Sequence, residues 1–263
     1  MTTMDVRVTT AGVLRSEWTK FRSLRSTYWT LIITVIVSIG LGVIVSAVQA
    51  SQWPHASPGE RAGFDPVMSS LAGTMLGQLG VGVLGVLLIS GEYSTGMIRA
   101  TMTAVPMRLP VLWSKLAVFT AVITVAAFTV TLVAFFSGQA LLSSQHIQTT
   151  LGHGDALRRV IGAALYLIVI GILGMALGAL WRNTAAGIST LAGLVFVLPI
   201  LAEALPSSWG RNILPYMPAN AGQSLWAKPD TAHLAPWTGF AVLCAYAVAA
   251  VAVAAFLLHR RDT

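Results

Sequence analysis

The chain has 263 residues, 56% of them hydrophobic and 10% charged, with a mean hydropathy of +0.76. Because soluble domains average about 25% charged residues, this composition excludes an ordinary soluble enzyme and indicates a protein that crosses a membrane several times. The formal charge of +7 could indicate a nucleic-acid partner. Its distribution along the chain, described below, argues against one.

The first predicted element is an amphipathic helix over Gly12–Thr27. Its apolar side chains recur at helical spacing, and basic side chains occupy the remaining arc. This pattern is typical of a helix in the membrane interface, with basic groups on anionic headgroups and aromatic rings in the boundary. The residues expected to make these contacts are Trp18, Lys20, Phe21 and Arg22. A basic arm that contacts DNA is the alternative, but this helix leads directly into a membrane span, which disfavours it.

Six apolar runs are each long enough to cross the hydrocarbon core of a bilayer. They are Tyr28–Val48, Val67–Ser90, Leu112–Phe136, Val160–Leu180, Ala185–Leu205 and Trp237–Leu258. The glycines of the second run permit either close helix packing or a flexible transport helix, and the sequence favours neither. The fifth run is interrupted near its end by Pro199 and Glu203. We therefore predict an all-α membrane protein with six transmembrane helices. Its single domain covers residues 1–263: a cytoplasmic segment over 1–27, a six-span bundle over 28–258 and a cytoplasmic tail over 259–263.

A polar segment, Gly91–Lys115, separates the second and third spans. Gly91 is expected to end the second span, because glycine readily takes the left-handed turn that follows a helix. A short surface helix is predicted over Tyr93–Ala104, with Glu92 at its start. At helical spacing Glu92, Gly96 and Arg99 share one face. The segment is either a solvated loop that anchors two spans or a docking element that moves them with a cytoplasmic partner. In both interpretations Glu92 and Arg99 are expected near water.

Two longer polar segments lie on the other side of the predicted bundle. Ser137–Arg159 contains His146 and His153, which are too few ligands for a zinc site. In Pro206–Pro236, the part Ile213–Trp226 is apolar enough to lie on or dip into the membrane, but it is too short and too proline-rich to span it.

The orientation of the bundle follows from its basic residues. Eleven of the 16 Lys and Arg residues fall on the side of the two termini and the central segment, where four of the nine acidic residues also lie. The positive-inside rule therefore predicts that both termini are cytoplasmic. Because this side carries the whole formal charge, topology explains the basic pI and no nucleic-acid partner is expected.

Several kinds of chemistry are missing from the sequence. The interiors of the predicted spans contain no Lys, Arg, His or Asp, and the only acid is Glu203, which argues against a proton- or ion-coupled pump. The chain has no P-loop and no H-E-x-x-H motif, and its predicted spans offer no serine with a nearby histidine for intramembrane hydrolysis. Its single cysteine, Cys244, cannot form an intramolecular disulfide and is expected to pack as a small apolar residue. We expect no catalytic residue, metal site or cofactor in this chain, so energy for active transport must come from another protein.

Four stretches resemble the type-2 ABC transporter permease family, in the exporter-like class common in actinobacteria. The two most specific are Glu17–Ser23 (EWTKFRS) and Gly91–Arg99 (GEYSTGMIR), and the others are Trp181–Gly187 (WRNTAAG) and Leu214–Pro218 (LPYMP). The resemblance implies a permease subunit of the bacterial cytoplasmic membrane that forms a translocation path. It also implies a second permease copy or a paralogue, and a separately encoded P-loop ATPase that binds ATP and Mg.

The resemblance further implies a coupling helix between the second and third spans, with an ATPase-coupling role at Glu92, Tyr93 and Arg99. The substrate and its binding site are not indicated, although an uncharged, glycine-rich path favours an amphiphilic or apolar molecule. A non-transporting scaffold or sensor subunit would share these helices. A membrane-embedded enzyme is a further alternative, but it would need a convergent polar site that the sequence does not offer.

Overall fold

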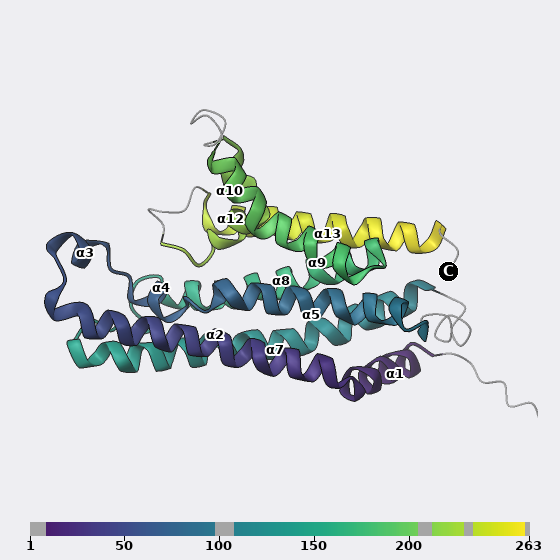
Figure 1. Ribbon diagram of the computed structural model, residues 1–263, viewed down its shortest axis with the longest axis horizontal. Coiled ribbons are helices and arrows are strands. Elements are labelled where there is room, and N and C mark those ends of the chain that lie inside the picture. Colours follow the sequence, from purple (N-terminus) through teal and green to yellow (C-terminus); the bar gives the residue numbers. More distant parts are fainter. Residues whose placement is uncertain (1–8, 98–107, 205–211, 229–233, 261–263) are drawn as a thin grey trace, which may run out of the picture.

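The computed structural model describes residues 9–97, 108–204, 212–228 and 234–260. All regular secondary structure in these residues is helical, and six helices are long and apolar enough to span a membrane (Figure 1). The predictions of an all-helical fold and of six helices long and apolar enough to cross a membrane are therefore confirmed for the described residues.

The spans are longer than the apolar runs that predict them. They are α2 (Arg25–Gln52), α5 (Thr74–Ser94), α7 (Arg108–Leu142), α8 (Ala156–Trp181), the broken helix of α9 (Thr184–Ala192) and α10 (Leu198–Glu203), and α13 (Pro236–Arg260). The shorter helices are α1 (Thr10–Ser23), α3 (Pro58–Gly63), α4 (Pro66–Ser70) and α12 (Pro218–Gln223). The described residues also form three 3₁₀ turns, η1 (Trp53–His55), η2 (Ser143–Gln145) and η4 (Leu214–Tyr216), and the π-helical turn η3 (Gly193–Val197).

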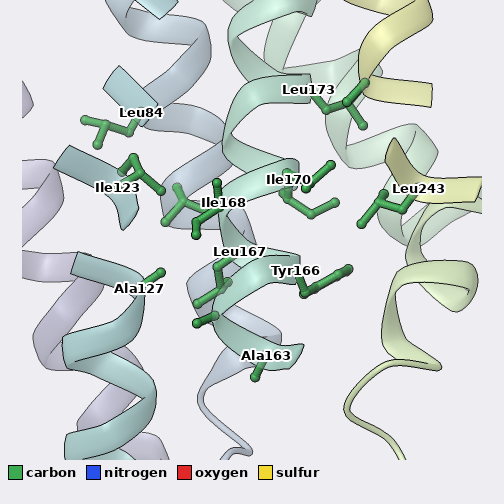
Figure 2. Close-up of a cluster of buried hydrophobic side chains, with 14 of the residues drawn as sticks. Leu84, Ile123, Ala127, Ala163, Tyr166, Leu167, Ile168, Ile170, Leu173 and Leu243 are labelled. Atoms are coloured by element: carbon green, nitrogen blue, oxygen red, sulfur yellow. The ribbon is translucent and has the colours of Figure 1, made fainter. Parts of the chain in front are cut away.

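Helix α8 forms the centre of the bundle. Its most apolar stretch is 83% buried, against 22% for α2, for the broken fifth span and for α13. A helix that is apolar on every side is suited to such a position, because it can pack against neighbours all round. Figure 2 shows side chains of α8, including Tyr166, Leu167 and Ile170, between Leu84 of α5, Ile123 of α7 and Leu243 of α13.

The closest helix packing joins α5 to α8 through glycines. A Cβ atom added to Gly174 would lie 2.2 Å from the carbonyl oxygen of Gly82, and one added to Gly85 would lie 2.3 Å from that of Gly171. Such distances show that the two backbones touch, as small residues allow in membrane bundles. The structure thus supports helix packing as the role of the glycines in the second span.

The second span is not continuous, contrary to the prediction over Val67–Ser90. Helix α4 ends at Ser70, a turn follows, and α5 begins at Thr74. The backbone of α2 approaches this turn so closely that a Cβ on Gly73 would lie 1.7 Å from the Ser38 carbonyl oxygen. The break therefore lets α2 pack directly on the start of α5.

The fifth span is irregular around Pro199, as its sequence suggests. Residues Gly193–Val197 form a π-helical turn between α9 and α10, in which the amide of Leu198 donates to the carbonyl oxygen of Gly193. Proline cannot donate a backbone hydrogen bond, so the regular helical ladder cannot continue through Pro199.

The segment around α12 folds back against the bundle rather than crossing it. Pro218, Leu225 and Trp226 are buried, and a Cβ on Gly239 of α13 would lie 2.3 Å from the Ala221 carbonyl oxygen. The surface predicted to meet lipid over Ile213–Trp226 is thus largely covered by α8 and α13.

Different helices lie at the two ends of the bundle. Figure 1 shows α1 and the carboxyl end of α13 at one end, which we call the α1 end, and α3 with α4 toward the other, which we call the α3 end.

Candidate functional site

Helix α1 presents one face to the protein. Its amino terminus is capped by Thr9, whose hydroxyl accepts from the Gly12 amide. Val13, Glu17 and Phe21 recur every fourth residue, lie on one side of the helix and are buried, where α1 packs on α7.

This arrangement corrects the predicted lipid contacts of α1. Trp18 remains 45% exposed and Arg22 is exposed, as a lipid-facing role requires. Phe21, in contrast, is buried against the helix bundle, and Lys20 is half-buried and faces two carboxylates. The apolar stripe of α1 is therefore shared between protein and surroundings, a division that helical periodicity cannot predict.

The carboxyl end of α5 differs from its prediction as well. The helix continues through Gly91 to Ser94, and the left-handed residue that follows it is Gly96, with φ of +72°. Glu92 thus lies in the last turn of a span and is only 3% exposed, so the expectation that it lies near water is wrong. A carboxylate is unfavourable at the negative end of a helix dipole, and its burial here depends on neighbouring cations.

Those cations complete a buried ion cluster of four residues: Glu17, Lys20, Glu92 and Lys115. The ammonium of Lys115, in α7, lies 2.5 Å from Glu17 Oε2 and 2.9 Å from Glu92 Oε1. The ammonium of Lys20 lies 2.8 Å from Glu17 Oε1 and 3.3 Å from Glu92 Oε1. The ion cluster therefore joins α1, α5 and α7 at the α1 end.

The ion cluster has no net formal charge, which makes its burial possible. Burial disfavours the charged form of Lys20, but hydrogen bonds and charge from Glu17 and Glu92 outweigh this and raise its pKa above the usual 10.5. The oxygen Glu92 Oε2 is buried without a hydrogen-bond partner among the described residues. A cavity of about 10 Å³ adjoins the four side chains, which is close to the space that one water needs.

The turn between α8 and α9 contacts the same end of α5. Arg182 ends α8 in the left-handed conformation, with φ of 52°, and its guanidinium lies 5.2 Å from the centre of the Tyr93 ring. The hydroxyls of Ser90 and Thr184 are 2.8 Å apart and share a hydrogen bond. Asn183 caps α9 by accepting from the Ala186 amide. The α8–α9 turn is therefore fixed to the last turn of α5.

These contacts bring together sequence stretches that are far apart in the chain. EWTKFRS supplies Glu17 and Lys20, GEYSTGMIR supplies Glu92 and Tyr93, and WRNTAAG supplies Arg182 and Thr184. The fourth stretch, LPYMP, forms η4 and the start of α12 and packs elsewhere, against α13.

The predicted coupling residues have separate outcomes. Tyr93 belongs to α5 rather than to a separate short helix. Arg99, and the rest of the predicted helix from residue 98 to Ala104, lie outside the described residues.

Sequence reasoning did not assign the ion-cluster roles of Glu17 and Lys115. Glu17 is an acid in the otherwise apolar line of Val13 and Phe21, and Lys115 is a base at the start of the third apolar run. Each of these charged residues interrupts an apolar pattern, and their charges are opposite. That combination was the one sequence signal that could have predicted their pairing.

A second set of ion pairs lies near the α3 end. Arg159 is buried, donates to both carboxylate oxygens of Asp65 and bonds the Trp226 carbonyl oxygen at 2.8 Å. Arg158 donates to Asp155 and, at 2.6 Å, to the Leu225 carbonyl oxygen. Although burial raises the pKa of Asp65, the hydrogen bonds from Arg159 and from backbone amides lower it below the usual 3.8. These bonds attach the segment after α12 to α8 and to the cap of α4.

Within the four described stretches, no group of three or more His, Cys, Asp or Glu side chains could hold a metal ion. Comparison with known proteins finds no protein-family model that matches the chain and no significant match among curated proteins.

Proposed function

We propose that the chain is the membrane-spanning permease subunit of an ABC exporter in the bacterial cytoplasmic membrane. A separately encoded P-loop ATPase, which binds ATP and Mg, would supply the energy, and a second copy or a paralogue would complete the path. The observation that carries the proposal is the meeting of three stretches at the α1 end. Each stretch was singled out because it resembles this family. The contact between Lys20 and Glu92 joins two of the stretches across 72 residues of the chain.

The ion cluster gives the proposal a physical mechanism. Glu92 is two residues from the end of α5, and Lys115 is near the start of α7, so their pair closes the segment between these spans. A partner that displaces this segment would move α5 and α7 as one unit, together with α1 through Glu17. The α8–α9 turn, attached to Tyr93 and Ser90, would move with them.

In this proposal the α1 end faces the cytoplasm and both termini are cytoplasmic. The exposed side of α1 carries Trp18 beside Arg15 and Arg22, a combination suited to an anionic membrane surface. The amphipathic helix would therefore hold the coupling region at the level of the headgroups.

The proposal is tested by purifying the tagged chain with its ATPase. A P-loop ATPase should co-purify in a stoichiometric complex, and ATP hydrolysis should depend on that partner. Reconstituted transport should stop when the P-loop lysine of the partner is changed to alanine, while a protonophore at constant ATP should have little direct effect. Transport that an ion gradient drives in proteoliposomes without any ATPase would refute the proposal. A scaffold or sensor subunit would assemble with partners but move no substrate.

A further inference from the structure

The connection between α2 and α4 runs through α3 at the α3 end (Figure 1). Together with the adjoining ends of these helices, it lines an open cavity of about 660 Å³. This volume is within the range of small-molecule sites, about 300–1,000 Å³. The lining includes Gln52, Trp53, His55, Glu60, Phe64 and Asp65.

The connection is more ordered than a simple link between two helices requires. Thirteen residues separate α2 from α4, whereas most helix connections are about 2–8 residues long. Ser57 and Glu60 form a reciprocal cap on α3, and the rings of Trp53 and Phe64 pack with centres 5.0 Å apart. Arg61 lies 5.5 Å from the centre of the Trp53 ring and donates to the carbonyl oxygens of Trp53 and Pro54. The cavity walls are therefore held in place without a ligand.

The charge in the lining is negative. Among the described residues that line the cavity none is Lys or Arg, and two are carboxylates. Arg159 neutralises Asp65 through both of its oxygens. Glu60 accepts only from the amide and hydroxyl of Ser57, both through Oε2 at 2.7 Å, and no described cation forms an ion pair with it. Glu60 therefore has no ion-pair partner among the described residues, and it lines the cavity together with the rings of Trp53 and Phe64.

We propose that this cavity binds an organic cation that carries an apolar or aromatic group. A carboxylate together with aromatic faces is the combination that recognises ammonium and guanidinium ligands, and Arg61 on Trp53 shows the same attraction within the protein. The proposal does not rest on the transport function, because it concerns binding at the α3 end alone.

The test uses the full chain in nanodiscs of zwitterionic lipid, with benzyltrimethylammonium as the probe in calorimetric or ligand-observed NMR titrations. Phenylacetate, which has the same ring and the opposite charge, is the matched ligand control. We expect saturable binding of the cation and none of the anion over the same concentrations.

The decisive variant is Glu60→Gln. Glutamine at this position retains the reciprocal cap with Ser57, so the variant removes the charge and preserves the fold of α3. It should bind the cation at least fivefold more weakly, and Trp53→Leu should weaken binding too. Asp155→Asn removes a charge near the same end from outside the cavity lining and should change binding less than twofold. No saturable cation binding, equal binding of phenylacetate, or an unchanged affinity in Glu60→Gln would overturn the proposal.

Discussion

At the scale of the residue, the most informative side chain is Glu92. An exposed surface ion pair contributes only about 0–1 kcal/mol to stability, whereas breaking a buried pair by removing one partner costs about 3–5 kcal/mol. The 3% exposure of Glu92 and its contact with Lys115 at 2.9 Å place it in the second class.

We therefore predict that Glu92→Gln lowers the free energy of unfolding of the purified protein by about 3 kcal/mol. The measurement is the fall in its thermal unfolding midpoint. The reason is that Lys115 keeps its charge but loses one of its two carboxylates. The double variant Glu92→Gln/Lys115→Met should recover part of the loss, because it leaves no unpaired ammonium. Arg15→Gln, on the exposed side of α1, is the control and should have little effect. Equal midpoints for Glu92→Gln and wild type would contradict burial of this pair.

Asp65 gives a prediction about pH. Its folded-state pKa is lowered from 3.8, so its stabilising contribution is complete above that value and is lost as the pH falls through the lower folded pKa. Asp65→Asn should be less stable than wild type at neutral pH, and the difference should shrink progressively below pH 3.8. Unfolding midpoints of both proteins measured from neutral to acid pH check this. A difference that stays constant across the acid range would show that the ionised carboxylate does not provide the stabilisation.

At the scale of the element, the length of the apolar runs predicted the six spans, because a helix that crosses a bilayer must be apolar for about 20 residues. It did not predict the break before Thr74 or the extension of α5 past Gly91. Both depend on tertiary packing: α2 occupies the space beside Gly73, and Lys115 stabilises Glu92 within the helix. The stretches of the candidate site were visible in the sequence, whereas their pairing across helices was not.

The α5–α8 contact gives the prediction that belongs to this scale. Gly174→Ala places a methyl group 2.2 Å from a backbone oxygen that cannot turn aside, so the two helices must separate. Overpacking of this kind costs about 1–3 kcal/mol, and the thermal midpoint should fall accordingly. Gly40→Ala in α2 is the matched control, because a Cβ there meets nothing within 4 Å and alanine favours helix. If both variants behave alike, the close contact between α5 and α8 is wrong.

At the scale of the whole molecule, the basic residues are divided unequally between the two ends of the bundle. The α1 end carries the Lys and Arg residues of α1 together with Lys115, Arg182 and Arg260. The α3 end carries Arg61, Arg158 and Arg159. Arg158 and Arg159 are not free surface charges, because they donate hydrogen bonds to the segment after α12. They hold the shape of that end.

Orientation in the membrane is the prediction at this scale, and it follows from the excess of basic residues at the α1 end. Cys244→Ala gives a cysteine-free background, since the chain has one cysteine. Thr150→Cys, at an exposed position between η2 and α8, should react with a membrane-impermeant maleimide applied to intact spheroplasts. Thr95→Cys, exposed just after α5, should react only after the membrane is permeabilised. Because both positions are exposed, a difference in labelling reports the side of the membrane rather than burial in the protein. Labelling of Thr95→Cys from outside, with Thr150→Cys protected, would reverse the orientation and place the ion cluster away from any cytoplasmic ATPase.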